Sequence, residues 1–596
     1  MAAMNSPSGT ERLLRLAVAM VTLVTFVALA WLLASCYRGF DITDESYYLI
    51  WMADPWRYPV SVTQFGFVYH PLYLLIGGDI AILRQINVLG TFLLAWALCL
   101  LTLRCCGASS MDRPHWRSPT SLAIAAVLAT SSLIAFRLML LTPSYNSLCF
   151  QALMVAGCGL LLAEQRLDRI SLVGWVLIGL GGWLGFMGKP TTAMAMALWS
   201  PLFLLISGRL SWRGAGLAAL VAAVMLVISA MYIDSSVETF YCRMRAGIYT
   251  GELLESGHTL RDSLRIDVLP LPSLRLMALL LGALAISIAA GLTLARYQWL
   301  RFAILSGTVA VSVMALTMIV GNWLPQFKST PFLGTLILMV SVGAVLLALA
   351  LGFGRSSWPV PRRALAVALC FPLAPHALAF GTNNNYWEAG SQAAIFWLLG
   401  GLGLLLPFLS REHAARVMLP LLVVGQAIAI LIVQWAFTHP YRQPQPLWRL
   451  NTPVAVGGAG GTLWVHAELA EYTQELRRQA ADAGFIPGMP MIDLTGESPG
   501  GPYLLGAAAI GQPWMVGGYP GSRAMAKDML GRVPASELKR AWLLVEPGGS
   551  RQMPVELLAD FGLFRAGGYQ EVGRVLAPRF TATEPLRPQF ILRPVP

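Results

Sequence analysis

Long apolar segments follow one another through most of this chain of 596 residues, and they constrain its fold more than any other feature. Each is long enough to cross the hydrocarbon core of a bilayer as a helix. Hydrophobic residues make up 56% of the chain and charged residues 12%, a composition outside that of soluble globular proteins. The sequence therefore predicts an α-helical polytopic membrane protein. We expect about thirteen spans, at 13–36, 85–103, 120–136, 147–163, 171–187, 192–207, 214–233, 276–295, 302–321, 331–353, 364–380, 392–409 and 417–437.

Arginines distinguish the two sides of the predicted membrane domain, residues 1–437. Arg12 and Arg15 precede the first span, and further arginines recur in every second loop. Because cytoplasmic loops carry the excess of Lys and Arg, the N-terminus and these loops are predicted to be cytoplasmic. The intervening loops, with 37–84 and 234–275 the longest, and the C-terminus are then predicted to lie outside. Topology thus accounts for the net charge of +12, and no nucleic-acid partner is needed to explain it.

The composition changes after the last span. Residues 438–465 are rich in Pro and Gly, which predicts a linker. In residues 466–596, an amphipathic helix pattern near 466–484 alternates with strand-like stretches such as 489–494, and this predicts a small α/β domain outside the membrane. The seven histidines and eight cysteines show no metal-ligand spacing. We therefore expect no cofactor and no metal, and no motif supports a divalent cation.

Two acidic residues, Asp44 and Glu45, follow the first span closely and are predicted to lie at the outer membrane surface. A carboxylate at that edge is a good general base for a sugar or lipid hydroxyl, whose proton must be removed as the hydroxyl attacks. We expect Asp44 to be this base, with Glu45 as a second catalytic residue. An alternative is that Asp41, Asp44 and Glu45 cap a helix that begins at Ser46.

Two cations are candidates for binding a phosphate. Lys189 departs from the arginine preference of the chain and lies at the outer end of the fifth expected span. Its ammonium would stabilise a departing lipid-linked phosphate, although an ordinary snorkelling lysine also fits. Arg84 lies outside, against the positive-inside trend, and would help to bind that phosphate or pair with Asp79.

Polar and aromatic residues of the outer loops are candidates for binding a sugar. Amides and hydroxyls suit sugar hydroxyls, and aromatic rings suit the C–H faces of a sugar. Tight turns and a structural histidine explain the same residues equally well. The candidates are Tyr47, His70, Tyr145, Asn146, Asn384, Tyr386 and Glu388.

A set of these features resembles a known family. Its residues are Asp44, Glu45, Tyr47 and Tyr48 in the first outer loop, Arg84 before the second span, and Lys189 and Pro190 at an outer helix end. With the C-terminal outer domain, they resemble the GT-C superfamily of membrane glycosyltransferases, which includes the aminoarabinose lipid A transferases and the protein O-mannosyltransferases. The resemblance covers residues 11–440 in architecture, and motifs support it mainly at 41–48 and 188–191.

The resemblance implies a polyprenyl-phosphate sugar as donor, with Asp44 as the catalytic carboxylate and Lys189 near the phosphate. Many members carry a second acidic residue in the outer loop after the third span, where this chain has Ser144, Tyr145 and Asn146. That departure argues against a divalent-metal mechanism based on such a carboxylate.

The expected function is therefore transfer of a sugar from a polyprenyl-phosphate donor to a hydroxyl of a glycan, lipid or protein, at the outer face of a bacterial inner membrane. A ligase or polymerase of lipid-linked glycans stays open, since Arg243 and Arg245 lie in an outer loop. A transporter or flippase would place ionisable groups in the middle of spans, whereas this chain keeps them near span ends. A noncatalytic assembly protein would tolerate Asp44→Asn.

Overall fold

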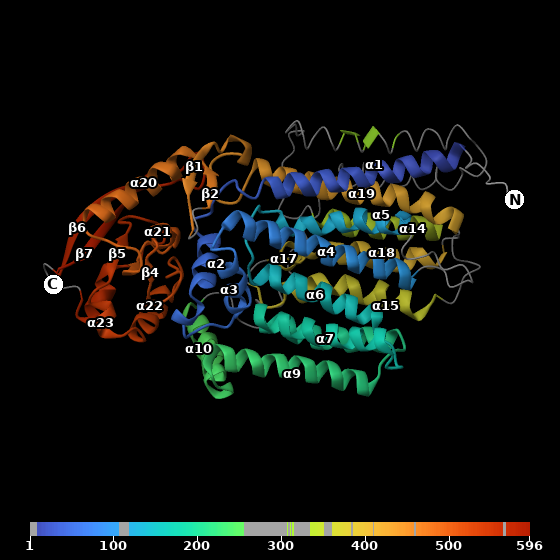
Figure 1. Cartoon of the computed structure of the whole chain (residues 1–596), viewed down its shortest axis with the longest axis horizontal. Coiled ribbons are helices and arrows are strands. Elements are labelled where there is room, and N and C mark those ends of the chain that lie inside the picture. The colour runs from blue at the N-terminus through green and yellow to red at the C-terminus, as the bar shows by residue number, and fades with distance from the viewer. Residues whose placement is uncertain are drawn as a thin grey trace.

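The computed structural model describes residues 9–106, 119–255, 334–350, 360–382, 385–408, 411–457, 461–563 and 568–595, with a few isolated positions between 256 and 333. These residues form an elongated bundle of helices and, at one end of it, an α/β region (Figure 1). The expected fold class, a helical membrane domain followed by a small α/β domain, is confirmed.

Most bundle helices run along its length. Among the described residues, seven are long and apolar enough to cross a membrane: α1, α4, α5 with η2, α6, α7, α9 and α19. The bundle elements are α1 (Gly9–Ala34), α4 (Ile80–Cys106), α5 (Pro119–Ala129), η2 (Thr130–Phe136), α6 (Tyr145–Leu162), α7 (Arg169–Gly188), α8 (Pro190–Ile206), α9 (Trp212–Asp234), α14 (Thr335–Ala350), α15 (Arg362–Cys370), η3 (Phe371–Leu373), α16 (Ala374–Ala379), α18 (Ile395–Leu405), η5 (Leu406–Phe408) and α19 (Arg411–Thr438). The chain is a multi-pass membrane protein.

Two parts of the expected span pattern need comment. The expected spans 276–295 and 302–321 lie outside the described residues. The expected span 364–380 is not one helix, because α15 gives way to η3 and α16. Pro372 and Pro375 lie in this stretch, and proline removes a backbone donor and clashes with the preceding helical turn. A continuous span there was therefore a wrong prediction.

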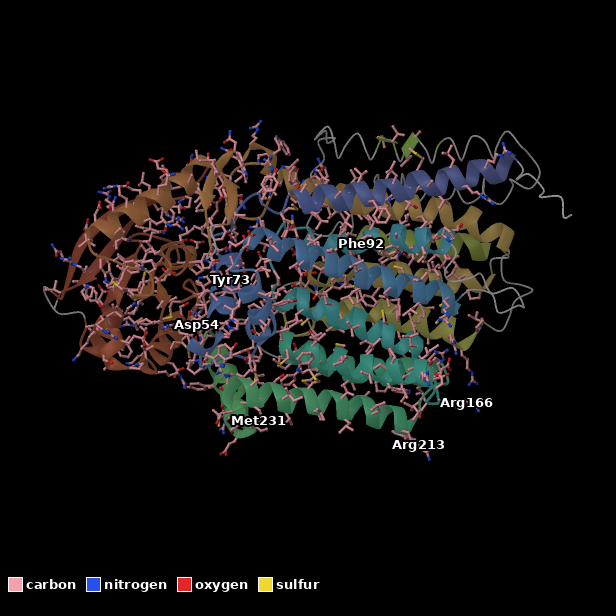
Figure 2. All side chains as sticks on the ribbon, viewed as in Figure 1. Asp54, Tyr73, Phe92, Arg166, Arg213 and Met231 are labelled. Atoms are coloured by element: carbon pink, nitrogen blue, oxygen red, sulfur yellow. The ribbon has the colours of Figure 1, made fainter. Side chains whose placement is uncertain are left out.

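The two ends of the bundle differ in what they carry. Arg166 and Arg213 lie at the end remote from the α/β region (Figure 2). The opposite end carries the shorter elements α2 (Asp44–Ala53), η1 (Pro55–Arg57), α3 (Phe65–Leu75), α10 (Val237–Leu253) and α17 (Tyr386–Gly390). Within the first long loop, the Trp51 ring stacks on Tyr58 at 5.0 Å between ring centroids, and both rings are buried. The aromatic residues of this loop thus belong to a core that they share with residues of the C-terminal region.

The C-terminal region is a mixed five-stranded sheet with flanking helices. The strand order is β4-β3-β5-β7-β6; β3 pairs in parallel with β4 and β5, while β7 pairs antiparallel with β5 and β6. The elements are β3 (Pro490–Asp493), β4 (Ala508–Ala509), β5 (Trp542–Val545), β6 (Tyr569–Ala577), β7 (Arg587–Pro594), α20 (Ala467–Asp482), α21 (Gly500–Leu505), α22 (Ser522–Gly531), α23 (Ala535–Leu538) and η7 (Val555–Phe561).

The segment 438–465 is more ordered than a linker. It contains η6 (Leu447–Arg449) and an antiparallel hairpin of β1 (Thr452–Ala455) and β2 (Thr462–Val465). The Trp464 N–H donates to Tyr37 O, and the Gly39 N–H donates to Trp464 O, each at 2.8 Å. The expectation of a linker was therefore wrong: its β-branched and aromatic residues form strands that attach the C-terminal region to the end of α1.

The C-terminal region also contacts the first outer loop directly. The Gly500 N–H, at the start of α21, donates to Ile42 O at 2.8 Å. A Cβ at position 500 would lie 2.5 Å from Ile42 Cβ, so only glycine permits this approach. The segment that follows β3 therefore rests on the residues that precede α2.

We expect a pH-dependent stability from Asp493, which ends β3 and is fully buried. Burial raises its pKa to about 6, although Thr495 donates two hydrogen bonds to Oδ1. An unfolded aspartate ionises near pH 3.9, so between about pH 4 and pH 6 unfolding releases a proton and the free energy of unfolding falls as pH rises, by about 3 kcal/mol in total. Asp493→Asn should remove this slope in denaturant unfolding of the detergent-solubilised chain. An unchanged slope would contradict the assignment.

Candidate active site

Three carboxylates lie at the first turn of α2, and two of them accept hydrogen bonds from backbone N–H groups around this turn. Asp41 accepts hydrogen bonds from the N–H groups of Thr43 and Glu45, and the Asp41 N–H donates to Glu45 Oε2 at 3.1 Å. Burial, followed by the negative charge of Asp44, raises the pKa of Asp41 to about 7. Asp41 and Glu45 thus act as the helix-capping alternative expects. The helix, however, begins at Asp44 rather than at Ser46.

Glu45 and Arg84 form a buried ion pair. Their side chains are each 3% exposed, and Arg84 donates to both carboxylate oxygens of Glu45, at 2.8 and 2.7 Å. The other guanidinium contacts go to carbonyl oxygens of residues 36, 38 and 39, and Thr142 donates to Glu45. Every N–H of Arg84 is therefore engaged. Arg84 thus pairs with Glu45 rather than with Asp79, and this pair fixes the loop to α4; a catalytic role of Glu45 and a phosphate-binding role of Arg84 stay predictions.

Asp44 is the accessible carboxylate of the turn. Its side chain is 26% exposed, and its Oδ2 lies 3.4 Å from Nη1 of Arg442. The adjacent Tyr441 hydroxyl lies within hydrogen-bonding reach of Asp44. Burial, and then the charge of Asp44, raises the pKa of Tyr441, so this hydroxyl stays neutral at physiological pH. Asp44 thus faces an arginine and a tyrosine from the segment that follows α19.

Arg442 was not among the residues singled out in the sequence, where Pro440 to Pro446 suggested only a linker. Its backbone has φ of +49°, a left-handed conformation that is uncommon for a non-glycine residue. Such conformations persist where the surroundings fix them, and they concentrate at functional sites. Nothing in the residue types alone signals this backbone geometry.

The first turn of α6 borders the Asp44 carboxylate. Ser144 and Ser147 form a reciprocal capping box that fixes where α6 begins. This places the ring of Tyr145 against Tyr48, with 5.9 Å between centroids, and within electrostatic range of Asp44. Asn146 follows on the same turn and is partly exposed. The structure therefore places Tyr145 near Asp44, with Asn146 next to Tyr145 on the same turn.

Lys189 lies between α7 and α8, directly after the helix end that packs on this turn. Its Nζ donates to Leu378 O at 2.6 Å, and the residue is 7% exposed. A Cβ at Gly188 would lie 2.6 Å from Sγ of Cys149 and 3.1 Å from Tyr145 O, so the end of α7 packs directly on the first turn of α6. No carboxylate among the described residues forms an ion pair with Lys189. A buried ammonium without an anion is costly, and it favours binding of a negatively charged group.

Other candidate residues have other environments. Tyr47 packs with Phe65 and Trp514, at 6.3 Å between centroids in each case. His70 Nδ1 lies 2.7 Å from Met52 O and its ring meets Trp56, so it joins α3 to α2 rather than binding a ligand.

Two candidates between α16 and α18 form a separate cluster. Tyr386 stacks on His376 at 5.3 Å, and Glu388 lies 3.4 Å from Nη2 of Arg137. Neither of these contacts includes Asp44 or Lys189. Asn384 lies outside the described residues.

A cavity of about 690 Å³ lies between the first outer loop and the C-terminal region. Asp54 and Tyr73, which line it, lie where the two parts meet (Figure 2). Its other lining residues come mainly from η1, α20, α21 and β4, and neither Asp44 nor Lys189 belongs to the lining. This cavity is therefore distinct from the site around Asp44. Within the described ranges, no three His, Cys, Asp or Glu side chains converge as metal ligands do.

Two solved structures are among those similar to this chain. No family model and no curated protein sequence matches the chain. The crystal structure of ArnT from Cupriavidus metallidurans bound to undecaprenyl phosphate is similar over 96% of this chain and 97% of its own, with 14% identity and a TM-score of 0.39. The cryo-EM structure of the arabinofuranosyltransferase AftD from mycobacteria has 14% identity and a TM-score of 0.45, and the likeness covers 98% of this chain but 40% of that one. At these TM-scores we draw no conclusion from either likeness.

Proposed function

We propose that this chain is a membrane glycosyltransferase of the GT-C type that moves a sugar from a polyprenyl-phosphate donor to a hydroxyl acceptor. One observation carries the proposal: two groups border the first turn of α6. Asp44, an accessible carboxylate, lies within electrostatic range of Tyr145, and the end of α7, which leads into the buried Lys189, packs on the Tyr145 carbonyl. A base and a phosphate-binding cation near one helical turn are the two groups that this transfer needs.

The reaction is a single displacement. The acceptor oxygen attacks the anomeric carbon while Asp44 takes the hydroxyl proton. The bond between that carbon and the phosphate oxygen breaks, and its electron pair leaves with the polyprenyl phosphate. Lys189 stabilises the charge that develops on this leaving group. We propose that the reaction uses no divalent cation.

A lipid-linked donor also suits the surface near the site. A cavity of about 410 Å³ lies between α3, α4 and the start of α6. Leu72, Ile86, Leu93 and Leu94 give it a mainly apolar lining, and Leu93 belongs to the lipid-exposed face of α4. Pro143, at its edge, directly precedes the turn that carries Tyr145. An isoprenoid chain would bury its apolar surface there.

Arg166 and Arg213, from two of the arginine-rich loops, lie at the end of the bundle remote from the α/β region, whereas α2, which carries Asp44, lies at the opposite end (Figures 1 and 2). We therefore place Asp44, Lys189 and the C-terminal region on the outer face of a bacterial inner membrane, with the N-terminus in the cytoplasm. The acceptor is a hydroxyl of a cell-envelope glycan, a lipid or a protein.

The alternative of a ligase or polymerase loses part of its support, that of Arg243, while Arg245 is exposed on α10. Arg243 forms a bidentate ion pair with Asp234, at 2.8 and 2.7 Å, and also donates to Tyr58 O. Its guanidinium fixes α10 to α9 and the first outer loop, so it does not offer a site for a second lipid phosphate.

Lys189→Met tests the phosphate-binding role. We expect the catalytic efficiency for the donor, kcat/KM, to fall about 100-fold, because methionine keeps the length of the side chain and removes the charge that meets the leaving phosphate. The measurement is transfer of radiolabelled sugar from a panel of polyprenyl-phosphate pentoses and hexoses in proteoliposomes. Lys527→Met is the control, since Lys527 is an exposed lysine paired with Asp560. Equal kcat/KM in Lys189→Met and wild type would overturn the role of Lys189.

A further inference from the structure

One aromatic ring of the C-terminal region contacts two arginines. Phe580 lies between β6 and β7 and is 8% exposed. The guanidinium carbon of Arg442 lies 5.9 Å from its ring centroid, and that of Arg587 lies 5.8 Å from it. Both distances fall within the range of cation–π attraction. Phe580 therefore connects the arginine beside Asp44 to an arginine that begins β7.

Arg587 is fixed from the side of the sheet. Its Nε lies 2.7 Å from Oε1 of Glu546, and its Nη2 lies 3.5 Å from Oε2 of Glu497. Glu546 is 1% exposed and accepts a hydrogen bond from Gln589 at 2.7 Å. The arginine on the face of Phe580 is thus held by a buried, hydrogen-bonded carboxylate that directly follows β5.

Arg442, by contrast, has few attachments of its own. Its contacts are the loose 3.4 Å ion pair with Asp44, the ring of the adjacent Tyr441 at 4.8 Å, and Phe580. Its left-handed backbone, with φ of +49°, costs free energy and needs surroundings that maintain it. Phe580 is the contact that the β6–β7 hairpin supplies, and the charge of Glu497, from the same C-terminal region, also acts on Arg442.

We propose that Phe580, supported by Arg587, is a positioning residue of the transferase centre: it holds Arg442 beside Asp44, so that the C-terminal region completes the site. This inference rests on the proposed function. Phe580 does not touch the reacting atoms in this account. It fixes the orientation of Arg442, and Arg442 in turn fixes the orientation of the carboxylate that receives the acceptor proton.

Loss of the Phe580 ring should lower kcat. Leucine fills most of the volume of phenylalanine but lacks the π face, so Phe580→Leu should leave the fold intact and release Arg442. We expect kcat to fall by roughly 3- to 10-fold, the range set by a partly exposed cation–π contact. The KM for the donor should stay unchanged, because the phosphate meets Lys189. Phe580→Tyr keeps the ring and should keep most of the activity.

The experiment measures kcat and donor KM for the full-length protein in proteoliposomes, with the polyprenyl-phosphate sugar of the panel that the wild type transfers. Phe590→Leu is the matched control: Phe590 lies on β7 and carries Arg574 at 5.4 Å from its centroid, which is the same kind of contact in the same hairpin. It should leave kcat unchanged. In an Arg442→Gln background, Phe580→Leu should have no further effect, because the ring acts through that arginine.

The possible outcomes separate this inference from the proposed function. If the wild type transfers sugar and Arg442→Gln lowers kcat, but Phe580→Leu matches wild type or its effect persists without Arg442, the positioning role is overturned. If Phe580→Leu and Phe590→Leu lower kcat equally, the ring serves only the fold of the hairpin. If the wild type transfers no sugar from any donor of the panel, the proposed function itself fails.

Discussion

Asp44→Asn should reduce the rate of sugar transfer by roughly 10²- to 10⁴-fold, the usual contribution of a general base. The substitution keeps the shape of the side chain and removes its ability to take a proton. Asp44 is the carboxylate of its turn that is not engaged by the start of the helix. Asp41 accepts from a backbone N–H group, and Glu45 accepts from a backbone N–H group and from Arg84. The loss should therefore be one of chemistry, measured as kcat with saturating donor and acceptor in proteoliposomes.

The matched control is Asp54→Asn. Asp54 lies on the same loop, is half exposed and pairs with Arg57 at 3.0 Å, so its removal should leave kcat within about twofold. Full activity in Asp44→Asn would contradict the assignment of the base. No transfer by the wild type would favour the alternative of a noncatalytic assembly protein.

Arg84→Met should destabilise the protein by about 3–5 kcal/mol, because it leaves the Glu45 carboxylate buried without its partner. The pair is 3% exposed on both sides, and Arg84 also joins α4 to three backbone carbonyls at the end of α1. Denaturant unfolding of the detergent-solubilised chain measures the change.

Two further variants define the cause of that loss. Arg478→Met removes an exposed ion pair of α20 and should leave the free energy of unfolding nearly unchanged, because solvent screens such a pair. The double variant Glu45→Met with Arg84→Met should recover much of the lost stability, since an apolar pair of similar volume does not carry the desolvation cost of buried charges. A stable Arg84→Met protein with a raised donor KM would contradict us and restore a phosphate-binding role for Arg84.

The sequence predicted the membrane domain well because a span is a local property of composition. A long run of apolar residues favours hydrocarbon whatever its neighbours are. The preference of arginine for cytoplasmic loops is likewise a property of the local sequence. The exceptions are also local: Pro372 and Pro375 divide an expected span, and the short strands of the β1–β2 hairpin lie within a stretch whose prolines and glycines suggested a linker.

The site was predicted only in part, because roles depend on contacts between distant segments. Asp44 and Lys189 were identified from their residue types and from where they lie relative to the spans. The sequence could not show that Glu45 pairs with Arg84, which is 39 positions away, or that Arg442 reaches Asp44 across 398 positions. Phe580 has no local signal at all, since its role depends on the docking of a separate folded region.

Transfer from lipid-linked and nucleotide-linked donors is the most direct test of the central claim. The purified wild-type chain, reconstituted in proteoliposomes with an envelope extract as acceptor, would be offered the panel of radiolabelled polyprenyl-phosphate sugars and the matching nucleotide sugars. We predict transfer from at least one polyprenyl-phosphate sugar and none from the nucleotide sugars. Transfer from nucleotide sugars alone, or from no donor, would contradict the account.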